Sequence, residues 1–138
     1  MPIQGGCLCR KIRYKFDQTD LLGSGVCHCI NCQKQAGSAF SINLIMQLSS
    51  FTVSGDLSTY EDKGEESQEP VYRRFCGNCG SPIFSEIVAA AGLIAVKAGT
   101  LDDTSVFQPS SQIWCDSQQN WVELLEGLPK FSRNPPAP

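Results

Sequence analysis

Seven of the eight cysteines in this chain fall in three tight clusters, and sulfur ligands at such spacings can hold a metal ion. The clusters are Cys7/Cys9, Cys27/Cys29/Cys32 and Cys76/Cys79, whereas Cys115 stands apart. Thiolates are soft ligands that select zinc. Zinc takes four protein ligands in structural sites, and three with one open position in catalytic sites. The cysteine pattern therefore predicts zinc binding.

The spacing inside the clusters is compatible with sulfurs that converge on one point. In an extended segment, residues i and i+2 project to the same side, so Cys7 and Cys9 can present two sulfurs to one ion. In the segment Cys76-Gly77-Asn78-Cys79-Gly80, the glycines permit the positive φ values of a sharp turn, and freed backbone N–H groups can point at the sulfurs. This segment is typical of a zinc knuckle.

The number of ligands divides the clustered cysteines into four and three. Cys7, Cys9, Cys76 and Cys79 would close a structural site, and Cys27, Cys29 and Cys32 would form a second site with a vacant position. The rival partition is a zinc ribbon made of Cys29/Cys32 and Cys76/Cys79, which would leave three clustered cysteines without a shared role. Spacing favours the first partition and leaves the second open.

Disulfide bonds and inert core positions are the other interpretations of the cysteines. The N-terminus has neither the basic nor the apolar part of a secretory signal, so we expect a cytoplasmic protein whose thiols stay reduced. The Cys-x-Cys pairs are too close for an easy bridge, and core cysteines would be scattered along the chain. Metal binding is the stronger interpretation.

Length and charge narrow the class of protein. At about 150 residues per domain, 138 residues make one domain. Eleven Lys and Arg against fourteen Asp and Glu give 11 − 14 = −3, which argues against a nucleic-acid partner. The longest apolar run, residues 87–96, is shorter than the ~20 residues of a membrane span. We expect no membrane partner, and the oligomeric state stays open.

The elements that would position the cysteines are predicted to be strands. Apolar and polar residues alternate at 12–16 and 40–48, and short apolar runs follow at 71–75, 82–84, 93–98 and 113–115. Turn motifs separate them, including Gly23-Ser24-Gly25 and Ser54-Gly55-Asp56. Helix is limited to about one turn after Cys29, and the acidic segment 61–69 is predicted to be a solvated loop. The fold class is mainly β.

With these clusters, the chain resembles the glutathione-dependent formaldehyde-activating enzyme family, whose members share the β-tent fold. The resemblance rests on Gly6-Cys7-Leu8-Cys9, Cys27-His28-Cys29-Ile30-Asn31-Cys32, Gly37-Ser38-Ala39-Phe40, Phe75-Cys76-Gly77-Asn78-Cys79-Gly80-Ser81-Pro82, Gly99-Thr100-Leu101-Asp102-Asp103, Pro109 and Trp121. It implies a single zinc-binding domain at residues 1–131. Residues 132–138, which end in a proline-rich run, are expected to form a loose tail.

The resemblance also implies zinc sites and a reaction. The outer pairs would hold a structural zinc that pins a β-tent sheet fold, and Cys27, Cys29 and Cys32 would hold a catalytic zinc. An alternative is that this second site binds zinc weakly and stays partly occupied until substrate is present. The implied activity is that of a carbon–sulfur lyase, or its synthetic reverse, with a glutathione-type thiol as co-substrate and formaldehyde or another small aldehyde. The product would be an adduct like S-hydroxymethylglutathione. A thiol would complete the coordination of the open zinc and be deprotonated there.

Three positions differ from the family pattern. Gln33, Gln112 and Gln118 occupy places where members often carry His, Lys or Arg. Because glutathione is anionic, fewer cations predict weaker capture. Lys34, the basic residue nearest the middle cluster in sequence, is then the first candidate for substrate contact.

Other residues have simpler interpretations. In an extended segment the side chain of His28 points away from its cysteine neighbours, so we expect packing rather than acid–base work. Cys115 is predicted to be a small core residue. Arg73 and Arg74, which precede the knuckle, are expected to be solvated, with contact to a glutathione carboxylate as the alternative. Asp102 is expected to shape a turn.

The competing function is a non-catalytic binding module of the same β-tent fold, in which zinc only stabilises the structure. Such a module needs a closed four-ligand site and has no use for a three-thiolate site with a vacancy. The middle cluster therefore favours an enzyme.

Overall fold

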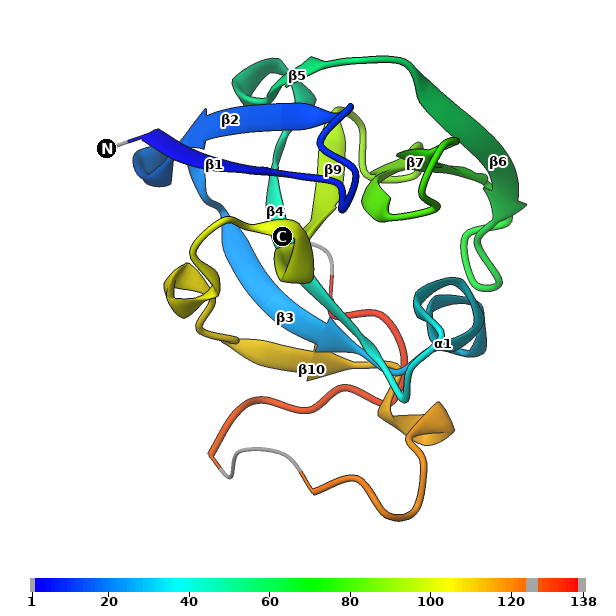
Figure 1. Ribbon diagram of the computed structural model, residues 1–138. Helices are drawn as coiled ribbons and strands as arrows, with labels where there is room; N and C mark the ends of the chain where they lie inside the picture. Colours follow the sequence, from blue (N-terminus) through cyan, green and yellow to red (C-terminus); the bar gives the residue numbers. More distant parts are fainter. Residues whose placement is uncertain (1, 124–126, 137–138) are drawn as a thin grey trace.

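The computed structural model describes residues 2–123 and 127–136, which form two β-sheets and one short α-helix (Figure 1). The elements are β1 (Pro2–Gly6), β2 (Arg13–Asp17), β3 (Gly23–Cys27), α1 (Ile30–Ala36), β4 (Ser41–Gln47), β5 (Thr52–Ser54), β6 (Leu57–Lys63), β7 (Pro70–Cys76), β8 (Pro82–Ile87), β9 (Leu93–Lys97) and β10 (Ser111–Ile113). The prediction of a mainly β fold is confirmed. None of the helices in this described part is long and apolar enough to cross a membrane.

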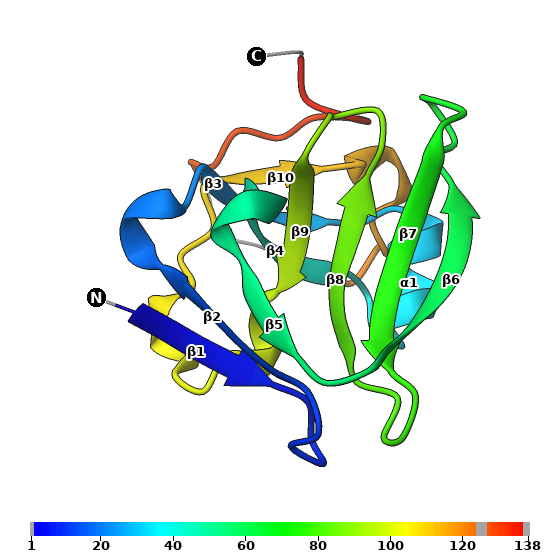
Figure 2. The same ribbon diagram turned by 90° about the horizontal axis from the view of Figure 1, so that it is seen from above.

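The two sheets differ in size and lie on each other. The larger sheet has the strand order β10-β3-β4-β9-β8-β7-β6, and the smaller has the order β1-β2-β5. Neighbouring strands are antiparallel except for β10 and β3, which run parallel. Figure 2 shows the smaller sheet in front of the larger one, with α1 behind it. The larger sheet therefore has one face toward the smaller sheet and one toward the helix.

The main core fills the space between the sheets. Tyr14 and Phe16 of β2 pack in the same buried cluster as Leu44 and Met46 of β4. The predicted alternation in residues 12–16 and 42–46 thus reflects strands with one buried apolar face. The opposite face of β4 carries buried polar residues, Ser41 among them, instead of solvent-exposed ones. This polar layer lies on the helix side of the sheet.

Two sequence predictions of irregular structure are wrong. Gly23-Ser24-Gly25 is not a turn but part of β3, where a Cβ on Gly25 would lie 3.1 Å from the backbone oxygen of Ser111 in β10. The glycine is used for the close approach of a neighbouring strand rather than for a bend. In the acidic segment, residues 61–63 extend β6 and pair with β7, so only the turn that follows is a loop.

Helix α1 spans about two turns instead of the one that the sequence predicts. It begins after Cys29, whose sulfur accepts a hydrogen bond from the backbone N–H of Cys32 at 3.2 Å, and it ends at Gly37 with φ of 60°. A cysteine at the N-cap and a glycine at the C-cap thus define the element.

Residues 132–134 lie along the segment that follows β10. The carbonyls of Arg133 and Ser132 accept hydrogen bonds from the backbone of Trp114 (3.0 Å) and Asp116 (3.1 Å), and the Trp114 indole donates to Asn134 at 2.7 Å. The division into a domain at 1–131 and a tail at 132–138 stays a prediction, and positions 137–138 lie outside the described residues.

We expect Leu44→Ala to lower the free energy of unfolding by about 2–5 kcal/mol, because it leaves a cavity in the core. Leu44 is 1% exposed in the main cluster, whereas Leu22 is 62% exposed. Leu22→Ala removes the same atoms from the surface and should change stability by less than about 0.5 kcal/mol. Urea denaturation measures both, and equal effects would contradict this account of the core.

Candidate functional site

The structure brings the outer cysteine pairs together as one four-sulfur cluster. The Sγ atoms of Cys7, Cys9, Cys76 and Cys79 all lie within 4.8 Å of one another. Cys7 follows β1 of the smaller sheet and Cys76 ends β7 of the larger one, so the cluster joins the two sheets. The Cys7–Cys9 and Cys9–Cys76 sulfur distances are 3.5 and 3.7 Å. A zinc tetrahedron with Zn–S of ~2.3 Å has edges of about 3.8 Å, so this donor set fits zinc.

Backbone and hydroxyl donors point at these sulfurs. Ile12 donates its backbone N–H to Cys7 Sγ at 3.2 Å, and Cys79 donates to Cys76 Sγ at 3.5 Å. Ser81 Oγ lies 3.3 Å from Cys79 Sγ, and the side-chain and backbone hydrogen bonds of Ser81 lower the pKa of Cys79 to about 5. Such donors stabilise thiolates, which are the metal-binding form of cysteine.

The middle cysteines form a separate three-sulfur cluster, here called the trio: Cys27, Cys29 and Cys32. Their Sγ atoms lie within 4.8 Å of one another, and in the described part of the chain no fourth His, Cys, Asp or Glu belongs to this group. Cys27 ends β3, Cys29 caps α1 and Cys32 lies in its first turn. The four-plus-three grouping is the one that the sequence favours over the zinc ribbon. Three soft sulfurs at this separation also fit zinc.

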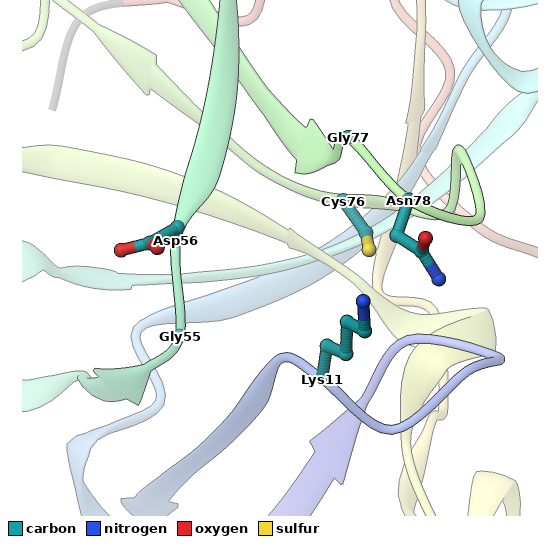
Figure 3. A pocket seen from close by; sticks show the side chains of 6 residues that line it. All are labelled: Lys11, Gly55, Asp56, Cys76, Gly77 and Asn78. Atoms are coloured by element: carbon teal, nitrogen blue, oxygen red, sulfur yellow. The ribbon is translucent and has the colours of Figure 1, made fainter.

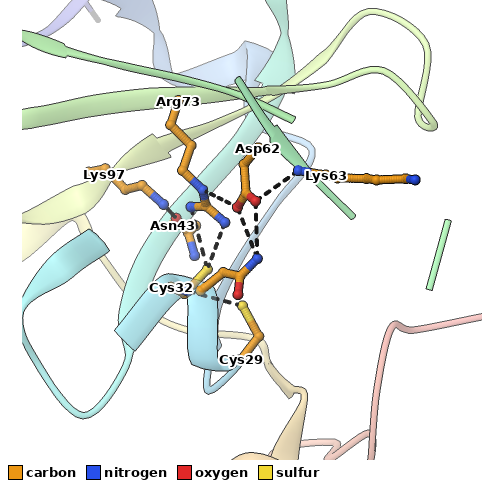
Figure 4. A network of polar contacts seen from close by, with 8 residues as sticks. Cys29, Cys32, Asn43, Asp62, Lys63, Arg73 and Lys97 are labelled. Atoms are coloured by element: carbon orange, nitrogen blue, oxygen red, sulfur yellow. Dashed lines mark hydrogen bonds and ion pairs between the residues drawn. The ribbon is translucent and has the colours of Figure 1, made fainter. Parts of the chain in front are cut away.

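Two buried cations lie beside the trio (Figure 4). The guanidinium nitrogens Nη1 and Nη2 of Arg73 lie 3.9 and 4.0 Å from Cys32 Sγ. Lys97 donates from Nζ to Asn43 Oδ1 at 2.9 Å. The residues Arg73 and Lys97 are each 7% exposed. The expectation that Arg73 is solvated is therefore wrong.

These charges shift the ionisation of the trio and of the cations themselves. Hydrogen bonds from the Cys27 and Cys29 thiols, together with the charges of Lys97 and Arg73, lower the pKa of Cys32. Burial lowers the pKa of Lys97, although Cys32 opposes the shift. Burial alone would also lower the pKa of Arg73, but Cys32 and Asp62 raise it. The electrostatics concentrate negative charge on Cys32.

Several residues singled out in the sequence lie away from the sulfurs or have other roles. Lys34 is exposed on α1, and because two residues correspond to about 200° of helix rotation it does not share the Cys32 face. His28 is fully buried, its Nε2 lies 3.2 Å from Gln112 Oε1, and its ring packs against Phe40, which agrees with the packing role. Cys115 is partly buried and lies outside both clusters.

Asp102 does more than shape a turn, because it forms a two-point ion pair with Arg13, with Arg13 Nη1 2.9 Å from Asp102 Oδ1. Arg13 belongs to β2, so the pair ties the 99–103 segment to the smaller sheet.

Sequence reasoning missed Lys97, Asn43 and Asp62. The sequence places Lys97 only within a short apolar run, and a charge inside such a run is the signal that marks it. Asp62 falls in the segment that the sequence predicts to be a solvated loop. Strand alternation places Arg73 and Arg74 on opposite faces of β7, but the sequence does not tell which face meets the cysteines.

Two cavities lie beside the four-sulfur cluster. One has a volume of about 470 Å³. Figure 3 shows the Lys11 side chain of its lining pointing toward Cys76 and Asn78. The other, of about 380 Å³, is lined by Cys7, Arg10 and Arg13 among other residues. Neither cavity is lined by the trio. Both are open to solvent beside a cluster that already contains four sulfurs.

The fold and its clusters define a mainly β protein with two sulfur sites, one of four ligands and one of three, that could hold metal ions. Residues 2–117 match the family described as "Glutathione-dependent formaldehyde-activating enzyme". This match includes all seven clustered cysteines and covers more than half of the chain. The chain therefore belongs to that family, as the sequence motifs indicate.

Individual relatives are more distant. A Halomonas elongata protein named "Putative glutathione-dependent formaldehyde-activating enzyme" is 24% identical over 128 residues, which cover 90% of this chain and 82% of that protein. The crystal structure of a Rhodobacter sphaeroides protein matches with a TM-score of 0.57 and 21% identity, covering 72% of this chain and 87% of the other. That likeness concerns the fold alone.

We expect Cys76→Ser to prevent stable folding. A structural zinc supplies about 10–16 kcal/mol, as much as the whole net stability of about 5–15 kcal/mol of an ordinary domain. Zinc analysis and a circular-dichroism melt would show loss of bound zinc and of the cooperative transition. Cys115→Ser, the same change outside both clusters, should leave both intact. A folded and stable Cys76→Ser protein would contradict a structural role for this cluster.

Proposed function

We propose that the chain is a carbon–sulfur lyase, or the corresponding synthase, that joins a glutathione-type thiol to formaldehyde or another small aldehyde. The proposal rests mainly on the trio, which has three convergent sulfurs and no fourth protein ligand among the described residues. Membership of a family named for glutathione and formaldehyde supports the choice of substrates. A binding module would need only the four-sulfur cluster.

In this proposal the two clusters have different duties. Cys7, Cys9, Cys76 and Cys79 hold a structural zinc that pins the two sheets, as in the β-tent fold. Cys27, Cys29 and Cys32 hold the catalytic zinc. When bound at the trio, zinc supplies a positive centre that favours the thiolate form of a substrate thiol. The chain fixes the three sulfurs from the end of β3 and the first turn of α1.

The reaction needs no redox partner. In the synthetic direction the sulfur forms a bond to the carbonyl carbon, the π electrons of the C=O bond move to oxygen, and that oxygen takes up a proton equivalent to the one lost by the thiol. The lyase direction reverses each change. The buried ring of His28, bonded to Gln112, is not used for this proton transfer.

Substrate contacts and location are further parts of the proposal. Lys34 is exposed on α1, two residues after Cys32 and on another face of the helix, where its ammonium group can meet a carboxylate of glutathione from solvent. A cytoplasmic location, where thiols stay reduced, agrees with eight cysteines that form no disulfide bond.

We expect Cys29→Ser to abolish the enzyme-catalysed formation of the S-hydroxymethyl adduct while the protein stays folded. Because the four-sulfur cluster is separate, zinc content should fall by about one per chain and thermal stability should persist. NMR exchange spectroscopy of glutathione with formaldehyde measures the enzyme-catalysed rate, and elemental analysis measures zinc.

Cys115→Ser is the matched control and should keep both activity and zinc. Activity that survives Cys29→Ser would remove the trio from the reaction. A wild-type protein with both sites loaded and no activity toward thiol and aldehyde would favour the binding module.

A further inference from the structure

We propose that Arg73 is a positioning residue that acts through Cys32, as a fixed positive charge that stabilises negative charge on the trio and on a thiolate ligand joining it. This inference rests on the proposed function, because it concerns how the same site accepts a thiol. It assigns a role to a β7 residue that lies outside the cysteine motifs.

The contacts place Arg73 between a carboxylate and a sulfur (Figure 4). Its Nε donates to Asp62 Oδ2 at 2.9 Å, while Nη1 and Nη2 lie 3.9 and 4.0 Å from Cys32 Sγ. Asp62 is held in turn by Asn31 Nδ2, at 3.2 and 3.0 Å from its two oxygens, and by the backbone N–H of Lys63 at 2.8 Å. Since Asn31 precedes Cys32 on α1, these four residues form a closed ring of contacts.

The burial of Arg73 calls for a second anion besides Asp62. A guanidinium group stays protonated, and burying it is costly unless its donors meet negative charge. Asp62 bonds only the Nε edge, whereas both Nη groups face the Cys32 sulfur. A thiolate at Cys32 supplies the missing partner. A purely structural ion pair with Asp62 would not require the Nη edge to point at a cysteine.

Charge counting shows why this contact matters for thiol binding. Three thiolates and one Zn²⁺ carry −3 + 2 = −1, and a fourth thiolate brings the site to −2. Negative charge accumulates unfavourably in a buried site of low dielectric constant. A positive charge about 4 Å from one of the sulfurs opposes that accumulation. Arg73 should therefore strengthen the binding of thiolates in general, whatever else the thiol carries.

Arg74 provides a matched control on the same strand. It points to the opposite face of β7, where it pairs with Glu86 at 2.8 Å and bonds Thr59 Oγ1 at 2.8 Å. Arg74→Gln removes the same charge from the same element without touching the trio. Arg73→Gln keeps a planar hydrogen-bonding group and removes the charge. Arg73→Lys keeps the charge and loses the planar guanidinium group with its several N–H donors.

The test is a thiol titration of the cobalt-substituted protein, followed by its sulfur-to-cobalt absorption, with glutathione and with 2-mercaptoethanol. We expect Arg73→Gln to raise the Kd of both thiols by about 10- to 100-fold relative to Arg74→Gln, the usual effect of losing an outer partner of a metal ligand. Arg73→Lys should stay within about threefold of Arg74→Lys, because it preserves the charge. If the role of Arg73 were merely structural, Arg73→Gln and Arg73→Lys would raise the Kd of the thiols equally.

The outcomes separate the two proposals. Wild-type protein whose trio takes neither cobalt nor thiol overturns the proposed function and this inference with it. Thiol binding in wild type with equal Kd values for Arg73→Gln and Arg74→Gln overturns this inference alone. If Arg73→Gln raises the Kd of glutathione but not that of 2-mercaptoethanol, this inference is also overturned, because Arg73 would then contact a carboxylate of glutathione. If Arg73→Gln does not fold, the test uses Arg73→Lys alone. A Kd that is about tenfold or more above that of Arg74→Lys then counts against the proposed role.

Discussion

Sulfur atoms held within 4.8 Å of one another repel strongly once they are ionised, and both cysteine clusters depend on how that repulsion is offset. At the four-sulfur cluster the offset comes from backbone N–H groups and the Ser81 hydroxyl around a site near the surface. At the trio it comes from buried cations, Arg73 and Lys97, on the helix side of the larger sheet. The same element, sulfur, is thus held in two different electrostatic environments.

These environments correspond to different positions in the fold. The four-sulfur cluster lies where a strand of each sheet ends, so it links the smaller sheet to the larger one. The trio lies at the junction of β3 and α1, behind the larger sheet, where a polar layer replaces the apolar core. A buried charge is stable only when it is paired, and Arg73 is paired with Asp62 on one side and with Cys32 on the other, while the exposed Asn31 amide holds Asp62.

The glutamines that depart from the family pattern have structural partners in this chain. Gln33 donates to the carbonyls of His28 (2.7 Å) and Ser117 (3.0 Å), Gln112 meets His28, and Gln118 bonds the carbonyl of Val122 at 2.8 Å. They brace the segments around the trio instead of offering charge. The positive charge near the trio comes from the larger sheet, where Arg73 of β7 and Lys97 of β9 carry it.

The sequence by itself determined the mainly β class and the strands with one apolar face, and it favoured the four-plus-three grouping of the cysteines, because these depend on local spacing and on the ligand number of the metal that thiolates select. Only the tertiary structure decided between that grouping and the zinc ribbon, and showed that Gly23–Gly25 is a strand, that Asp62 is part of a partly buried ion pair, and that Arg73 rather than Lys34 faces Cys32. These features depend on which strands become neighbours and which face of β7 and β9 meets α1. Strand pairing between distant segments sets those contacts, and no local pattern encodes it.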